Sequence, residues 1–318
     1  MSVPTGRLPD AVASLPPSSF FLTSAVFHYL GPSLAVLLFA HVDVLGVAWL
    51  RIASAAVVFA LWRRPWRMLR LAGPDRRRVL LALGAVLAAM NSLFYLAVDR
   101  LPLATVGAIE FLGTIVLAAA GARTRRNLLA LALAVGGVAV LTDVRLAGEP
   151  LGFAFAFANC AGFVLYVVLG HRVASSGAGP LGGIDQLGAA MVVAAAVATP
   201  IGLHQAAAAF GHPLWLAWGA GVGVCSSVVP YVTDQLAMAR LPRATFALML
   251  ALLPATATVI GLLVLAQVPT GRDLVGVALV IAGVAAHRTA AEPALTRDRA
   301  PDAAGTAPPA GRPRPGPA

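Results

Sequence analysis

The chain has 318 residues, of which 59% are hydrophobic and only 11% are charged. A soluble domain carries roughly 25% charged residues, so this composition excludes an ordinary water-soluble protein and predicts a membrane protein. The net charge of +10 rests on arginine alone, because the sequence contains no lysine, and the arginines cluster between apolar runs. That placement indicates membrane topology rather than a nucleic-acid-binding surface, so we expect no nucleic-acid partner.

The apolar runs predict an all-α, polytopic membrane protein with ten transmembrane helices, since each span needs about 20 mostly apolar residues. Residues 1–18 lack the basic leader of a cleaved signal peptide, so we expect them to stay as a cytoplasmic N-terminal segment before a retained first span. In chain order, the predicted spans are 19–40, 44–62, 79–98, 103–121, 128–144, 150–170, 186–203, 214–236, 244–267 and 274–287.

Arginine placement predicts how these spans cross the membrane. With the N-terminus inside, 19 of the 23 arginines fall on the inner side, seven of them in the connection 63–78, and only three on the outer side. The positive-inside rule therefore predicts that both termini are cytoplasmic. The segment 288–318 consists mainly of Ala, Pro, Arg and Gly without an apolar period, which predicts a disordered cytoplasmic tail.

A short string of residues occurs twice, 140 positions apart. RLPLAT at residues 100–105 precedes the fourth predicted span, and RLPRAT at residues 240–245 precedes the ninth. A five-span unit crosses the membrane an odd number of times, so its second copy must enter upside down. We therefore predict two inverted five-helix repeats, 19–145 and 146–287, with a substrate site near the midplane between them.

Two charged side chains lie deep within predicted spans, Arg51 in the second and Glu110 in the fourth. Each is roughly 12 Å from the outer face at 1.5 Å per residue, where an isolated charge costs at least about 2.5–3.5 kcal/mol. Their matching depth predicts a mutual ion pair. Two interpretations stay open: a switch, in which protonation of Glu110 releases Arg51 for a zwitterionic substrate, and a permanent bridge between the two spans.

Other polar residues of the spans are candidates for lining the same cavity. His28 lies in mid-span close to Pro32, which tends to kink a helix and expose carbonyl groups. It could relay protons, bind substrate, or remain neutral and bonded to a neighbouring helix. Asn91 and Tyr95 are four residues apart and so share one helix face. Tyr231 could either line the cavity or contact a neighbouring helix.

Asp234 lies near the inner end of the eighth predicted span, where two interpretations are open. It is either a solvated helix end or part of an inner gate. Cys160 and Cys225 both lie within apolar segments, and the sequence contains no CxxC or Cys/His cluster. We therefore expect packed thiols, no metal site and no cofactor.

The stretches 91–96 (NSLFYL) and 108–113 (AIEFLG) resemble the EamA-type drug/metabolite transporter (DMT) superfamily, most of all bacterial inner-membrane threonine/homoserine exporters. The stretch 230–242, which contains Tyr231 and Asp234, resembles the corresponding part of the second EamA unit. The resemblance covers about 20–287. It departs in the ninth span, where Leu253 precedes Pro254 although the family often has Glu-Pro, so the second half lacks this carboxylate.

The resemblance implies a bacterial inner-membrane protein that exports small metabolites, amino acids such as threonine and homoserine, by proton-coupled alternating access. Its partners would be the lipid bilayer, a small-molecule substrate and protons, and a homodimer is left open. Drug or other metabolite efflux, or uptake, on the same scaffold is the alternative. The sequence argues against an enzyme or an ATP-driven pump, because it has neither GxSxG nor GxxxxGK[ST]. A sensor would need a sizeable soluble domain, which is lacking.

Overall fold

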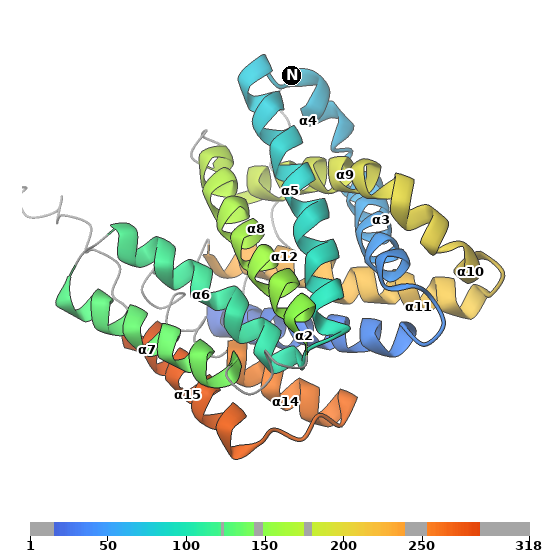
Figure 1. Ribbon diagram of the computed structural model, residues 1–318. Coiled ribbons are helices and arrows are strands. Elements are labelled where there is room, and N and C mark those ends of the chain that lie inside the picture. The colour runs from blue at the N-terminus through green and yellow to red at the C-terminus, as the bar shows by residue number, and fades with distance from the viewer. Residues whose placement is uncertain (1–15, 122–123, 143–148, 175–179, 239–252, 287–318) are drawn as a thin grey trace, which may run out of the picture.

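The computed structural model describes residues 16–121, 124–142, 149–174, 180–238 and 253–286, and every regular element within them is a helix (Figure 1). The predicted all-α class is confirmed for this part of the chain. The helices are α2 (Pro17–Leu38), α3 (Val44–Arg63), α4 (Trp66–Leu71), α5 (Pro74–Val98), α6 (Leu103–Gly121), α7 (Arg125–Thr142), α8 (Pro150–Ala174), α9 (Pro180–Gln205), α10 (Ala207–Phe210), α11 (Pro213–Gly223), η1 (Val224–Val228), α12 (Val229–Met238), α14 (Leu253–Leu265) and α15 (Gly271–Ala286).

Several of these helices are suited to crossing a membrane. Within the described residues, the segments long and apolar enough are Val44–Arg63, Pro74–Val98, Pro150–Leu169, Gly183–Gln205 and Pro213–Thr233. Shorter apolar helices occupy Leu22–Leu38, Leu103–Gly113 and Leu253–Leu265, where the first, fourth and ninth spans are predicted. Helices α7 and α15 coincide with the fifth and tenth. The described residues thus include several helices long and apolar enough to cross a membrane, as predicted, and the count of ten crossings stays a prediction.

Proline sets where many of the helices begin. Helices α2, α5, α8, α9 and α11 all begin at a proline, whose fixed φ suits the first helical turn and whose missing N–H would be unpaired there anyway. Helix α5 begins at Pro74, five residues before the predicted third span, with Asp75 in its first turn. An acidic side chain at a helix N-terminus is favourable, which explains why the helix continues into the arginine-rich segment.

The eighth predicted span, 214–236, is not one regular helix. Its helix changes to a π-helix at Val224–Val228, between α11 and α12. A π-turn widens the hydrogen-bond ladder locally and is frequent at functional sites. Pro230, in the turn that follows, has no amide hydrogen and cannot donate to the carbonyl of Ser226 four residues earlier. The irregular turn therefore leaves a backbone acceptor that a neighbouring helix can use.

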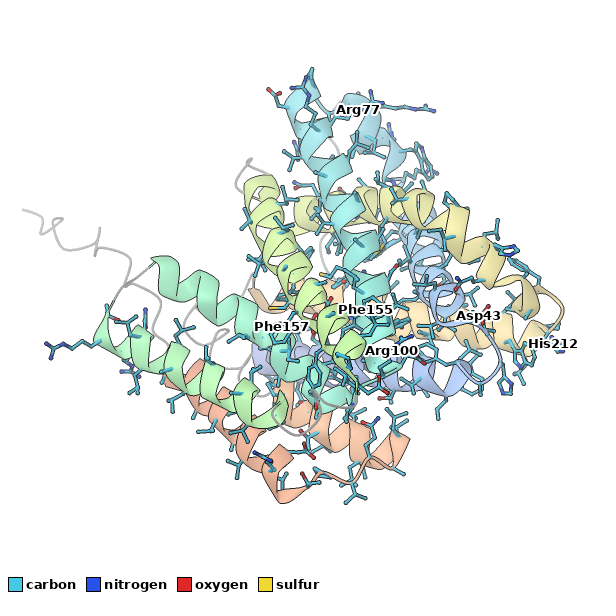
Figure 2. The ribbon with its side chains drawn as sticks, viewed as in Figure 1. Asp43, Arg77, Arg100, Phe155, Phe157 and His212 are labelled. Atoms are coloured by element: carbon cyan, nitrogen blue, oxygen red, sulfur yellow. The ribbon has the colours of Figure 1, made fainter. Side chains whose placement is uncertain are left out.

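Charged side chains mark the two ends of helix α5. Figure 2 places Arg77, in the first turn, at the top of the view, and Arg100, just past the last turn, far below it. Arg100 contacts the ring of Phe155, 5.3 Å from the ring centroid, and forms an ion pair with Asp99 at 3.1 Å. The helix between these ends carries the apolar residues of the third predicted span.

The buried apolar side chains form two clusters rather than one continuous core. On α3 one cluster ends at Leu50 and the other begins at Ile52, and on α5 the boundary falls between Met90 and Phe94. The residues at the boundary are polar: Arg51 on α3 and Asn91 on α5. A polar layer that contains Arg51 and Asn91 therefore separates two hydrophobic halves of the bundle.

Candidate functional site

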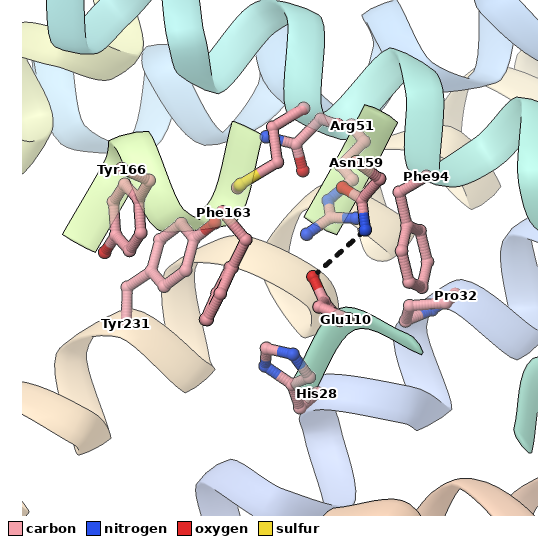
Figure 3. Close-up of a pocket in the computed structure, with 11 residues that line it drawn as sticks. His28, Pro32, Arg51, Phe94, Glu110, Asn159, Phe163, Tyr166 and Tyr231 are labelled. Atoms are coloured by element: carbon pink, nitrogen blue, oxygen red, sulfur yellow. Dashed lines mark hydrogen bonds between the residues drawn. The ribbon is translucent and has the colours of Figure 1, made fainter. Parts of the chain in front are cut away.

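A small cavity lies within this polar layer, between helices from both predicted repeats (Figure 3). About 30 Å³ of it is open to the centre of a water molecule, and one water needs about 10–15 Å³ of such space. The cavity therefore has room for about two waters in this conformation. Its lining residues are His28, Pro32, Arg51, Met90, Asn91, Phe94, Glu110, Asn159, Phe163, Tyr166 and Tyr231.

The cavity brings together most of the residues proposed from the sequence. His28, Arg51, Asn91, Glu110 and Tyr231 all line it, although they come from α2, α3, α5, α6 and α12. Tyr95 is not among the lining residues. The ring of Tyr95 lies under the Arg51 guanidinium, 5.4 Å from ring centroid to Cζ. Asp234 lies in α12, with its side chain outside the described part of the structure.

Arg51 is held by the π-helix rather than by a carboxylate. The side chain is 6% exposed, and its Nε donates to Ser227 Oγ at 3.0 Å. Its Nη2 donates to the backbone carbonyl of Ser226 at 3.1 Å, the acceptor that Pro230 cannot reach. The predicted ion pair with Glu110 is therefore wrong for this structure, because neutral acceptors of the irregular turn take the guanidinium and no Arg51–Glu110 bridge occurs among the described ion pairs.

Glycines allow the helices around Arg51 to approach closely. A Cβ at Gly31 of α2 would lie within 3 Å of the Ser226 backbone, at 2.7 Å from its nitrogen. A Cβ at Gly223 would lie 2.6 Å from the Arg51 carbonyl oxygen. Real Cβ contacts of this length are not tolerated, so both positions need glycine to bring α2 and α3 against the turn that holds Arg51.

Glu110 is bonded to an amide instead of a cation. Asn159 Nδ2 donates to Glu110 Oε1 across α8 and α6 at 3.4 Å, the dashed line in Figure 3. Glu110 is 5% exposed and Asn159 is fully buried. The second oxygen of the carboxylate, Oε2, and the amide oxygen of Asn159, Oδ1, have no hydrogen-bond partner among the described residues. Two buried acceptors, on two cavity residues that are hydrogen-bonded to each other, thus lack a protein donor, which is unfavourable unless a water, a ligand or an ion supplies one.

An aromatic wall closes one side of the cavity. The ring of Phe163 lies 5.9 Å from that of Tyr166, which in turn stacks on Tyr231 at 6.5 Å. Figure 3 shows these three rings grouped together, on the opposite side of the cavity from Phe94 and Pro32. Rings at these separations pack favourably with one another. They give the cavity an apolar surface beside its charged groups.

His28 lies at the lower edge of the cavity in Figure 3, beside Glu110. Its ring contacts the edge of the Tyr29 ring, with 5.2 Å between centroids. Pro32 is inside helix α2, four residues later, so the carbonyl of His28 loses its regular helical donor. The three interpretations of His28 stay open, because its place in the cavity fits each of them.

The sequence alone did not single out several residues of this site. Asn159, Phe163 and Tyr166 all come from α8, whose apolar run was treated only as a span. Asn159 is the single amide residue of that predicted span, a signal that could have identified it. Ser226 and Ser227 form a polar pair shortly before Pro230, a second such signal.

The chain is similar to known exporters over most of its length. The threonine/homoserine exporter RhtA of Salmonella typhimurium (strain LT2) is 33% identical over 258 residues, which cover 79% of this chain and 84% of that protein. RhtA of Escherichia coli (strain K12) is 32% identical over the same length. No protein-family model matches the chain. One solved crystal structure, 19% identical, superposes with a TM-score of 0.52 over 85% of this chain and 97% of that one, a likeness of fold alone.

Proposed function

Because the chain belongs to the threonine/homoserine exporter family of the EamA-type drug/metabolite transporters, we propose that it exports small amino acids from bacterial cells by proton-coupled alternating access. Its relatives are named as exporters, which confirms the prediction of a membrane transporter rather than an enzyme. The substrate, the coupling ion and the sites below are our proposals.

The observation that carries this proposal is the pair of unpartnered acceptors in the cavity. A primary ammonium has three N–H donors, and it would satisfy Glu110 Oε2 and Asn159 Oδ1 together. Arg51 lines the same cavity and has five N–H donors, more than its two hydrogen bonds to the π-helix use. An acceptor pair and a guanidinium on one cavity match the two charges of a zwitterionic amino acid.

The size of the cavity supports alternating access. A space for about two waters is too small for threonine, so the helices around it must separate to admit a substrate. We propose that this conformation is closed around the site, and that the site opens to one side of the membrane at a time. Both termini are proposed to be cytoplasmic, following the arginine distribution.

The packing of the helices supports two repeats, 19–145 and 146–287. In this scheme α2, α3, α5, α6 and α7 correspond to α8, α9, the α11–η1–α12 segment, α14 and α15. Exchanging the halves leaves three helix pairs unchanged: α3–α9, α6–α14 and α7–α15. When each helix is replaced by its counterpart in the other half, the pairs α5–α8, α6–α8 and α5–α9 become α2–α12, α2–α14 and α3–α11. All six of these pairs are packed together in the structure. A twofold relation between the halves accounts for this pattern.

Glu110 is the proposed coupling residue. Arginine stays charged in proteins, so of the two charged residues Arg51 and Glu110 only the carboxylate of Glu110 can bind and release a proton. An ammonium and a proton would then compete for Glu110, because either one neutralises its buried charge. Such competition produces exchange: a proton that binds from outside releases the amino acid, and the next amino acid displaces the proton inside.

Transport by the purified full-length protein in proteoliposomes tests the proposal. We expect efflux of threonine and homoserine that accelerates with an inward proton gradient and falls by roughly 10–100-fold with Glu110→Gln. Competition should require both charges, so N-acetylthreonine, which lacks the ammonium, should not inhibit. An efflux rate that does not change with the proton gradient would contradict proton coupling. Inhibition by N-acetylthreonine as strong as that by threonine would contradict the ammonium site.

The aromatic wall favours one alternative substrate class. Phe163, Tyr166 and Tyr231 offer apolar surface that a small side chain such as that of threonine would leave largely uncovered. Larger apolar amino acids or drugs would cover it. Stronger competition by phenylalanine than by homoserine in the same vesicles would favour this alternative.

A further inference from the structure

Residues of α3 and of the short helix α4 line a second hollow that shares no residue with the central cavity. Helix α4 lies at the top of Figure 1. The hollow is an open groove of about 530 Å³. Two apolar residues of α3 form one side, and three arginines and a tryptophan form the rest. The lining residues are Ala60, Leu61, Arg64, Trp66, Arg67 and Arg70.

The three arginines of this groove are exposed and form no ion pair with any residue that the structure describes. Their neighbour Arg63 behaves differently, because it binds both oxygens of Asp185 on α9, at 2.6 and 3.1 Å. Arg63 is thus neutralised by a carboxylate, whereas the three arginines that line the groove are not. Three unpaired guanidinium groups so close together favour an anionic ligand.

The backbone holds these arginines in place. Arg64 caps helix α3 in the left-handed conformation, with φ of 50°, which is uncommon for a residue other than glycine. This turn leads from α3 into α4, and Arg64 lines the same groove as Arg67 and Arg70. Arg67 and Arg70 are three residues apart on α4 and so lie on one face of the helix.

Apolar side chains around the groove are exposed to an unusual degree. Leu61 is 80% exposed and Leu71 is 83% exposed, while Trp62 and Trp66 are 52% and 42% exposed. Such a patch is unfavourable in water but suits the membrane–water interface, where tryptophan is enriched. A short helix with arginines beside leucine and tryptophan is typical of a segment that lies in that interface.

We propose that this groove binds the headgroup of an anionic phospholipid. The guanidinium groups of Arg64, Arg67 and Arg70 would bind the phosphate, and Leu61 and Trp66 would contact the start of an acyl chain. A net negative headgroup is expected, because a zwitterionic lipid already pairs its phosphate with its own cation. The expected contribution is about fivefold in affinity for each arginine near a membrane surface, on the order of 100-fold for the three.

Native mass spectrometry of the purified full-length protein in nonionic detergent tests this site. The protein is titrated with phosphatidylglycerol and with phosphatidylcholine of the same acyl chains. We expect tighter binding of phosphatidylglycerol, and a loss on the order of 100-fold in Arg64→Gln/Arg67→Gln/Arg70→Gln. The matched control, Arg77→Gln/Arg78→Gln/Arg125→Gln, removes the same charge from other exposed positions and should change the affinity only severalfold.

Three results would overturn the proposal. These are unchanged phosphatidylglycerol binding in the groove variant, an equal loss in the control, and displacement of the lipid by inorganic phosphate at the same concentration. If the groove variant does not fold, Arg64→Gly keeps the left-handed turn, which glycine favours, and should lose about fivefold. Brominated phosphatidylglycerol should also quench tryptophan fluorescence more in the wild-type protein than in Trp66→Phe. Equal quenching in the two would refute the site.

Discussion

The two proposed repeats share a packing scheme but contribute different chemistry to the central cavity. In the first half, α5 is an uninterrupted α-helix over Pro74–Val98, whereas its counterpart in the second half changes to a π-helix at Val224–Val228. The first half supplies both charged groups, Arg51 and Glu110, and the second supplies the neutral groups that bind them. The proposed duplication would account for the arrangement of the helices, and divergence of its second copy would account for how a charge is tolerated at the centre.

Loss of the Glu110 charge should have the largest effect on export. Glu110→Gln keeps the size of the side chain and removes its charge, and a hydrogen bond to a charged group contributes about 1.5–3 kcal/mol. We therefore expect export of threonine and homoserine to fall by roughly 10–100-fold. The measurement is export from cells, normalised to the amount of protein in the membrane. Glu149→Gln, which alters an exposed carboxylate at the start of α8, is the matched control and should export normally. Normal export by a correctly inserted Glu110→Gln would refute the proposed coupling role.

Substitution of Asn159, which comes from the second half, should have the next largest effect on export. Asn159→Ala removes the donor to Glu110 and one of the two free acceptors, so we expect about a tenfold higher KM for export. Asn91→Ala is the comparison, because Asn91 lines the same cavity but donates to Leu87 within its own helix. Its effect should be smaller. Equal effects would mean that the cavity responds to any lost amide, and the ammonium site would lose its support.

The π-helix can be tested through two glycines of α11 that differ only in their surroundings. A Cβ at Gly223 would overlap Ser54 Oγ and lie 2.6 Å from the Arg51 carbonyl oxygen, whereas a Cβ at Gly221 meets nothing within 4 Å. Overpacking costs about 1–3 kcal/mol, and glycine-to-alanine at an exposed helical site gains up to about 1 kcal/mol. Gly223→Ala should therefore lower the melting temperature in detergent and Gly221→Ala should leave it unchanged or raise it. Similar shifts would contradict the described packing.

The smallest effect is expected at the link between the halves. Arg63 of α3 and Asp185 of α9 form an ion pair that is 24% and 29% exposed, and pairs of this kind contribute about 0.2–1 kcal/mol. Asp185→Asn should lower the melting temperature less than Gly223→Ala does. The exchange Arg63→Asp/Asp185→Arg should recover part of the loss, and a lack of recovery would show that the two residues act separately.

Most of the fold could be predicted because it depends on local sequence. Long apolar runs predicted α3 and α6 almost to the residue. The predicted spans differ from the observed helices where residues other than the apolar ones determine how a helix begins or continues. Pro74 and Asp75 begin α5 before the apolar run does, and the apolar run of the eighth predicted span does not indicate the π-helix at Val224–Val228. The second copy of the string, 240–245, and the tail, 288–318, lie outside the described residues.

By itself, the sequence determined that the chain is a multi-pass membrane protein with Arg51 and Glu110 at one depth, because apolar composition and charge position are local properties. Only the tertiary structure decided the partners of those charges. Helices far apart in the chain bring Ser226 and Ser227 to Arg51, and Asn159 to Glu110. Equal depth does not select a partner, since a buried charge binds whichever donor or acceptor the packing of neighbouring helices places beside it.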